Sequence, residues 1–196
     1  YLNILGKHKL LDYQHYYKIG VLFENVGNYK NAIKYLDESV KLNHNFKCSY
    51  NSLGICNYMT KNYDKSLKAL NMAIKLDNKY ALAYNNIGLV SSKLDLDEEA
   101  VKYFDQAIKF NNNDKRPAFN LGVHYLKIGI YDVGFKLYEE RINCHDIYKS
   151  LPFRDDLSCW DGESKCNKLL ICWEQGIGDS IQFFRFVIEL KKRFKH

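Results

Sequence analysis

The sequence predicts an all-α fold, a right-handed superhelix of antiparallel helix pairs, from three observations. First, glycines recur 34 residues apart, at Gly20, Gly54, Gly88 and Gly122. Second, a small residue follows each glycine twelve positions later, at Ala32, Ser66, Ala100 and Gly134. Third, the 196 residues include only two prolines, which suits a chain that is helical nearly throughout. A fixed period of this length indicates a stack of helical repeats.

Each repeat is expected to hold two helices joined by a short turn. We expect the first helices near 13–26, 47–60, 81–94 and 115–128, and the second helices near 29–42, 63–76, 97–110 and 131–142. The glycines lie on the first helices, where the absence of a side chain lets the two helices of a unit approach closely. Leu36, Leu70 and Phe104 would then fill the space between units.

The repeat pattern resembles the tetratricopeptide repeat (TPR) over residues 13–142. Two features depart from that family: His44, Asn78 and Asn112 replace the usual closing proline, and Ala118 replaces an aromatic residue in the fourth copy. The expected division is a partial repeat or cap at 1–12, repeats at 13–46, 47–80 and 81–114, a degenerate repeat at 115–142, a linker at 143–167 and a further unit at 168–196.

The C-terminal unit is predicted to be one strand, a glycine-containing loop and one helix. Leu169–Trp173 is a short apolar run typical of a buried strand, and an amphipathic segment follows from Ile181. Together with Cys159–Gly162, the stretch Trp173–Phe183 resembles bacterial proteins that fuse TPRs to a glycosyltransferase of the heptosyltransferase and O-linked N-acetylglucosamine transferase class. The unit would be the start of a Rossmann-like domain.

The resemblance to glycosyltransferases implies a role for the loop. Asp179 maps onto the general base, and Gly176 and Gly178 would let the backbone approach a substrate. The alternative, which we favour for this chain, is that Asp179 caps the last helix. Because residues 168–196 are too few to build a donor site, we expect a nucleotide sugar to bind only if the chain belongs to a longer enzyme.

The second candidate site is the groove lined by the first helices. Its predicted residues are Tyr17, Asn51, Ser52, Ile55, Asn85, Asn86, Leu89, Phe119, Asn120, Val123 and Lys127. In O-linked N-acetylglucosamine transferases a ladder of asparagines holds an extended peptide by its backbone, and Asn86 and Asn120 match that ladder, whereas Lys18 and Ser52 do not. The alternative is that these asparagines simply face water.

Composition narrows the remaining functions. The net charge of +6 is spread along the helices, so nucleic acid is not the expected partner. Six cysteines occur without a CxxC pair, and we expect no metal and no cofactor. No apolar stretch is long enough to span a membrane, and the expected location is the cytoplasm of a bacterium.

The sequence therefore predicts a protein–protein interaction module that binds an extended peptide or partner segment. The alternative is the N-terminal portion of a TPR-linked glycosyltransferase whose repeats present the acceptor. Self-assembly through the ends of the stack is a third hypothesis.

Overall fold

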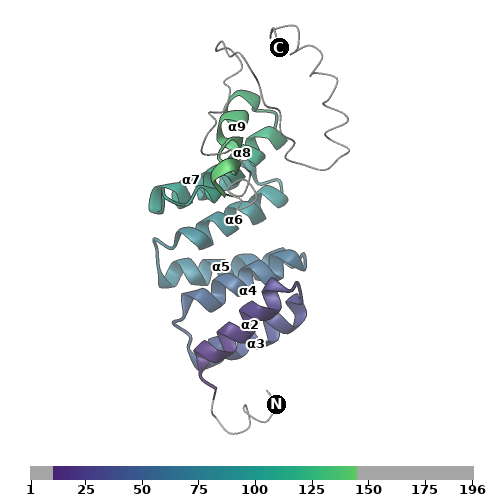
Figure 1. Cartoon of the computed structure of the whole chain (residues 1–196), viewed down its shortest axis with the longest axis vertical. Coiled ribbons are helices and arrows are strands. Elements are labelled where there is room, and N and C mark those ends of the chain that lie inside the picture. The colour runs from purple at the N-terminus through teal and green to yellow at the C-terminus, as the bar shows by residue number, and fades with distance from the viewer. Residues whose placement is uncertain (1–10, 145–196) are drawn as a thin grey trace, which may run out of the picture. The chain divides into compact units, whose positions relative to one another are not determined.

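The helices follow one another in pairs along residues 11–144, the part of the chain that this computed structural model describes (Figure 1). The first helices of the pairs are α2 (Tyr13–Asn25), α4 (Lys47–Met59), α6 (Ala81–Lys93) and α8 (Arg116–Lys127). The second helices are α3 (Tyr29–Leu42), α5 (Tyr63–Leu76), α7 (Asp97–Phe110) and α9 (Tyr131–Tyr138), followed by the short α10 (Arg141–Cys144). No strand occurs within these residues, which confirms the all-α prediction for this part of the chain.

The predicted strand–loop–helix unit at 168–196 lies outside the described residues, and so do Gly176, Gly178 and Asp179. The linker at 143–167 lies outside them beyond residue 144. The predicted C-terminal unit therefore stays a prediction.

The turn between the helices of a pair recurs with the same backbone. Gly27 and Gly129 have φ of 75° and 84°, and Lys61 and Asp95, at the equivalent places in the second and third repeats, have φ of 62° and 59°. A positive φ favours glycine, because a Cβ in the left-handed region is strained. The repeat thus demands a left-handed residue at one fixed position, and only two of the four turns use glycine there.

Close packing within each pair depends on the glycine of the first helix. A Cβ added to Gly54 would lie 2.4 Å from Leu70, and one added to Gly88 would lie 2.7 Å from the ring of Phe104. Leu36, Leu70 and Phe104 are fully buried, as are Ala32, Ala73, Ala100 and Ala107. The predicted steric role of the glycines and the filling role of the large residues are both confirmed.

The fourth repeat differs from the prediction at its second helix. The predicted helix over 131–142 ends at Tyr138, and α10 begins three residues later. The amide of Ile142 bonds to the Glu139 carbonyl oxygen, and the Arg141 guanidinium donates instead to the Tyr138 carbonyl oxygen at 3.4 Å. The Arg141 side chain thus occupies the acceptor that a continuing α-helix would have used.

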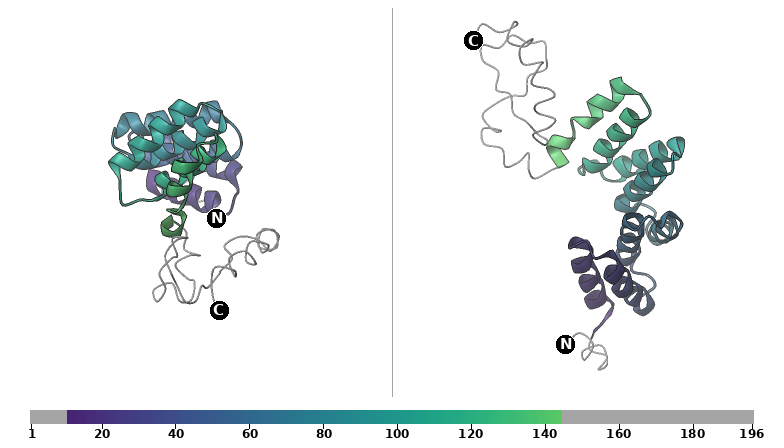
Figure 2. Two further views of the ribbon diagram at one scale, coloured as in Figure 1. Left: turned by 90° about the horizontal axis from the view of Figure 1, so that it is seen from above. Right: turned by 90° about the vertical axis from the view of Figure 1, so that its right-hand side faces the viewer.

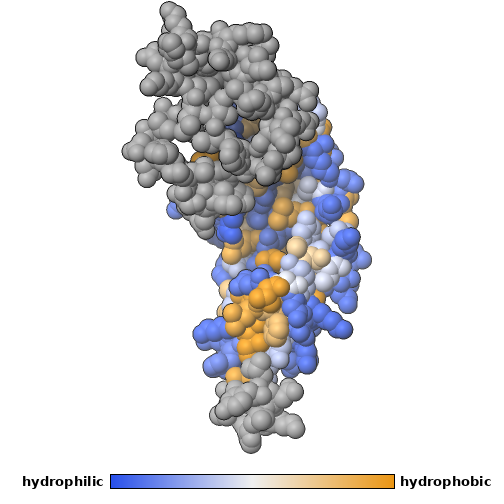
Figure 3. Space-filling view, turned by 45° about the vertical axis from the view of Figure 1, so that its right-hand side comes forward, coloured by the Kyte–Doolittle hydropathy of each residue, from blue (hydrophilic) through white to orange (hydrophobic). Residues whose placement is uncertain are grey.

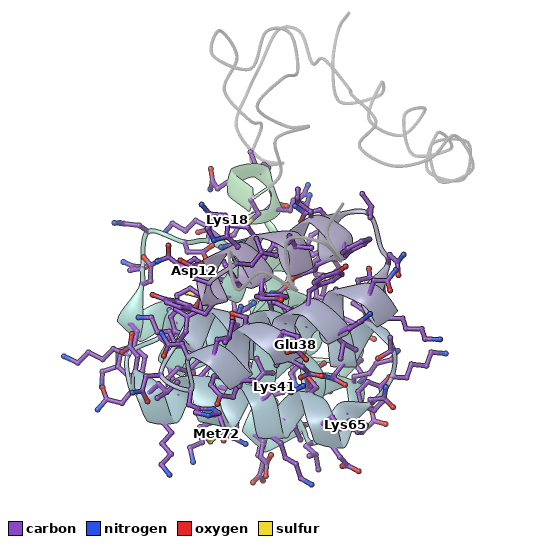
Figure 4. The ribbon with its side chains drawn as sticks, turned by 90° about the horizontal axis from the view of Figure 1, so that it is seen from below. Asp12, Lys18, Glu38, Lys41, Lys65 and Met72 are labelled. Carbon is purple, nitrogen blue, oxygen red and sulfur yellow. The ribbon has the colours of Figure 1, made fainter. Side chains whose placement is uncertain are left out.

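The first helices lie on the inner side of the stack. Contacts join α2 to α4, α4 to α6 and α6 to α8, whereas successive second helices make none of comparable extent (Figure 2). Seen from the N-terminal end, Lys18 of α2 lies on the opposite side from Met72 and Lys65 of α5 (Figure 4). We use the name first-helix face for Tyr17, Lys18, Val21, Glu24 and Asn25 together with their equivalents at successive 34-residue offsets.

Candidate functional site

The asparagines of the first-helix face bond to one another across neighbouring helices. The Asn86 side-chain amide donates to the Asn51 carbonyl oxygen at 2.9 Å, and the Asn120 amide donates to the Asn85 carbonyl oxygen at 2.9 Å. A longer contact of 3.5 Å joins the Asn85 amide to the Asn86 carbonyl oxygen. The ladder that the sequence predicts therefore exists, but its first contribution is to hold the repeats together.

The ladder keeps hydrogen-bonding capacity for a ligand. A side-chain amide carries two N–H donors and a carbonyl with two acceptor sites. Asn86 and Asn120 each use one donor in the ladder, and the Asn120 carbonyl oxygen accepts no hydrogen bond from residues 11–144. Both side chains are half-buried, so these free groups can reach a backbone laid along the face.

Aromatic side chains close the two ends of the predicted groove. The ring of Tyr17 packs edge-on against Phe46 with centroids 5.1 Å apart, and the ring of Phe119 lies 5.4 Å from that of Tyr138. Burial raises the pKa of the Tyr17 hydroxyl. Both residues are half-buried, so their packing role is certain and only part of each ring faces solvent.

Glu24 is the only acid of the first-helix face, and sequence reasoning missed it. Burial raises the pKa of its carboxyl, and a hydrogen bond with Ser52 partly offsets that effect. Its Oε2 atom is buried without a hydrogen-bond partner in the described part of the chain. Ser52 itself is buried, so its predicted place on the face is that of a support for Glu24.

The basic groups of the face fall into two kinds. Lys127 donates to the Asp95 carboxylate at 2.6 Å and also to the Ser92 carbonyl oxygen, which ties α8 to the preceding repeat. Lys18 and Lys93 are exposed and form no ion pair with residues 11–144. The cation that the sequence selected, Lys127, is thus already paired, and the free cations are Lys18 and Lys93.

An apolar pocket of about 140 Å³ opens between the second and third repeats. Its lining comes from α4, α5 and α6: Gly54, Ile55, Tyr58, Met59, Ser66, Leu70, Asn86 and Leu89. The structure therefore brings together Ile55, Asn86 and Leu89, three of the predicted groove residues. Val123, the equivalent of Leu89 in the fourth repeat, lies outside this pocket and is 43% exposed.

A buried polar cluster that sequence reasoning did not predict joins the third and fourth repeats. The His124 Nδ1 atom lies 2.8 Å from the Ser92 hydroxyl, and its Nε2 atom lies 3.7 Å from the Asp97 carboxylate. Serine, histidine and aspartate also form hydrolase triads, but His124 is 1% exposed and its Nε2 makes no hydrogen bond. The cluster is therefore a packing contact; the burial of Cys56 and Val90 at equivalent positions was the available signal.

Residues 11–144 contain no group of three His, Cys, Asp or Glu side chains that could hold a metal ion. Within the same residues no helix is both long and apolar enough to cross a membrane.

The sequence model of the tetratricopeptide repeat matches residues 13–46 and 81–114, which are the expected bounds of the first and third repeats. The chain carries tetratricopeptide repeats. No sequence among curated proteins matches it. The resemblance to glycosyltransferase fusions gains no support from these comparisons, because they rest on the TPRs alone.

Solved TPR structures resemble the described fold. The crystal structure of MamA is 25% identical, with a TM-score of 0.62 over 72% of this chain and 82% of that one. A thermophilic TPR protein of Thermus thermophilus is 18% identical, with a TM-score of 0.65 over 76% of this chain and 81% of that one. YrrB, described as a TPR protein with an unusual peptide-binding site, is 18% identical, with a TM-score of 0.57 over 72% and 73% of the two chains.

Proposed function

We propose that this chain is a protein–protein interaction module that binds an extended peptide segment along its first-helix face. The observation that carries the proposal is the combination, on one face, of free amide groups at Asn86 and Asn120 with apolar side chains at Leu89, Phe119 and Val123. The fold is also that of YrrB, which is described as having a peptide-binding site.

The asparagines would hold the backbone of the bound segment. Each amide can donate to a peptide carbonyl oxygen and accept from a peptide N–H, so it tolerates any side chain at that point. The apolar side chains would supply the burial that makes the contact favourable. The bound segment must be extended, because its backbone groups have to be free to pair with the face.

The expected affinity is micromolar. A short peptide loses much of its conformational freedom on docking, and that cost cancels most of the free energy gained from apolar contact. A dissociation constant of about 1 μM corresponds to roughly 8 kcal/mol of binding free energy.

A library of random dodecapeptides, selected on the immobilised chain, tests the proposal with a matched pair of variants. Val123→Glu adds a charge to an exposed position of the first-helix face, and Val133→Glu adds the same charge to an equally exposed position of α9 (43% and 45% exposed). Selected peptides should bind with micromolar dissociation constants, about tenfold more weakly to Val123→Glu and unchanged to Val133→Glu. The proposal fails if the library yields no ligand, or if both variants weaken the ligands equally.

The glycosyltransferase alternative depends on Asp179 and its loop, which lie outside the described residues. No observation within residues 11–144 favours it. A nucleotide sugar is therefore not among the ligands that we propose for this chain.

A further inference from the structure

The apolar pocket sits at the middle junction, the contact between the second and third repeats. Its mouth is formed by Met59, which is 48% exposed, and by the half-buried Ile55 and Leu89. A cavity of about 150 Å³ with apolar walls is large enough to hold a benzene molecule, and this pocket is close to that size at about 140 Å³. One large aliphatic side chain fits such a space.

The neighbouring junctions differ in the same repeat positions. Where the middle junction has Tyr58, the first junction has the carboxylate of Glu24 and the third has Ser92. The third junction also has Phe104 in place of Leu70, and that ring is fully buried against Gly88. A charged group in one junction and a larger ring in the other make the middle junction the better place for an apolar side chain.

The charge around the pocket is positive and unpaired. Lys93 lies one helical turn beyond Leu89 on α6, is exposed, and forms no ion pair with residues 11–144. Lys18 is likewise free on α2, whereas the acid of the face, Glu24, is withdrawn into the first junction. Blue polar and orange apolar residues lie side by side over the visible surface (Figure 3), so the surface offers both kinds of contact.

We propose that the middle junction sets the specificity of the face: it takes a leucine, isoleucine or methionine side chain from an acidic linear segment, with a carboxylate of that segment on Lys93. The inference rests on the proposed peptide-binding function and names its ligand class. One helical turn rises about 5.4 Å, and an extended chain advances about 3.3 Å per residue. The carboxylate therefore stands about two residues from the aliphatic side chain.

Three synthetic peptides test the inference. The probe is a fluorescein-labelled nonapeptide with a central leucine between two glutamates on each side, closed at both ends by glycine and serine. The second peptide carries serine in place of leucine, and the third carries lysines in place of the glutamates. Fluorescence anisotropy at low ionic strength gives the dissociation constants for the whole chain.

We expect the leucine peptide to bind about tenfold or more tightly than the serine peptide, because burial of a leucine side chain is worth at least that factor. Leu89→Gln should reduce this difference to within about twofold. Met59→Gln, at an exposed position, should do the same and serves as the second variant if Leu89→Gln folds poorly. Lys93→Glu should weaken the glutamate peptide about fivefold and spare the lysine peptide.

Met72→Gln and Lys65→Glu are the matched controls, because both residues lie on α5 on the opposite side from α2 (Figure 4). Neither should change any of the three constants. Equal binding of the leucine and serine peptides, or no binding of either, would overturn the inference. The proposed function would still stand in that case, since it depends on library peptides and on Val123→Glu.

Discussion

Asn86 donates its side-chain amide to Asn51, which lies 35 residues earlier, although the repeat is 34 residues long. The same offset of one residue recurs where Asn120 donates to Asn85. Successive first helices are therefore shifted so that one residue of each meets the residue before its equivalent on the preceding helix. Asn51 is only 7% exposed, so the bond satisfies a buried polar group.

Asn86→Ala should destabilise the stack by about 1–3 kcal/mol, because it leaves the Asn51 carbonyl oxygen buried without a donor. Urea unfolding followed by far-ultraviolet circular dichroism measures the change. Asn71→Ala is the matched control, since Asn71 is exposed on α5. The double variant Asn51→Ala/Asn86→Ala should be less destabilised than the two single changes added together. Equal midpoints for Asn86→Ala and Asn71→Ala would show that the bond contributes nothing.

Gly122→Ala should loosen α9 from α8. The new Cβ would lie 2.6 Å from the Tyr138 backbone nitrogen and 2.8 Å from the Leu137 carbonyl carbon, and backbone atoms cannot move aside as a flexible side chain can. The expected cost is about 1–3 kcal/mol. Hydrogen exchange measured by mass spectrometry should show faster exchange over residues 131–138.

Gly27→Ala is the comparison for Gly122→Ala, because its Cβ would meet nothing within 4 Å and only the positive φ is strained. It should cost about 1 kcal/mol and leave exchange over residues 131–138 unchanged. If Gly122→Ala left that exchange unchanged as well, the close approach would not be what holds α9.

The stability of the stack should fall as pH drops below about 6.5 because of His124. Burial lowers the pKa of His124 from 6.5; the Asp97 carboxylate opposes this shift, and Lys127 adds to it. Between pH 6.5 and the lowered value the unfolded chain binds a proton that the folded chain does not, so folding weakens as pH falls. The slope for one such group is at most about 1.4 kcal/mol per pH unit.

Unfolding midpoints measured between pH 7.5 and 5.5 test this pH dependence. His124→Gln should flatten the dependence across that window. His44→Gln, at an exposed position between α3 and α4, should retain it. A slope that survives in His124→Gln would assign the titration to another group.

Lys61→Gly should stabilise the second repeat by up to about 1 kcal/mol. Lys61 has φ of 62°, and glycine already occupies the equivalent place at Gly27 and Gly129. The gain is the relief of left-handed strain, less the entropy that glycine loses on folding. Lys68→Gly, in the middle of α5, should instead destabilise by about 1 kcal/mol. Thermal unfolding of both variants gives the two signs, and a lower melting temperature for Lys61→Gly would contradict the strain argument.

The helix boundaries could be predicted from the sequence because each repeat restates them. Seven of the eight predicted helices end within one residue of the observed bounds, since Gly20 and its equivalents fix the register of both helices in a pair. The early end of α9 could not be predicted, because it depends on where the Arg141 side chain places its guanidinium.

The candidate site was only partly predictable. The face of each helix follows from its register, so Ile55, Asn86 and Leu89 could be selected together. The pairing of Asn86 with Asn51 could not, because it depends on a one-residue shift between helices that the 34-residue period conceals. The same holds for His124, whose partner Ser92 lies 32 residues away.

The asparagine ladder gives the four repeats different grammatical roles. The second repeat supplies an acceptor at Asn51 but has Ser52 where a donor would stand, so it can only start a ladder. The fourth supplies a donor at Asn120 but has Phe119 in the acceptor position, so it can only stop one. The third carries both, at Asn85 and Asn86. Extra copies of residues 81–114 placed in tandem would therefore extend the ladder without interruption, whereas extra copies of either neighbour would break it.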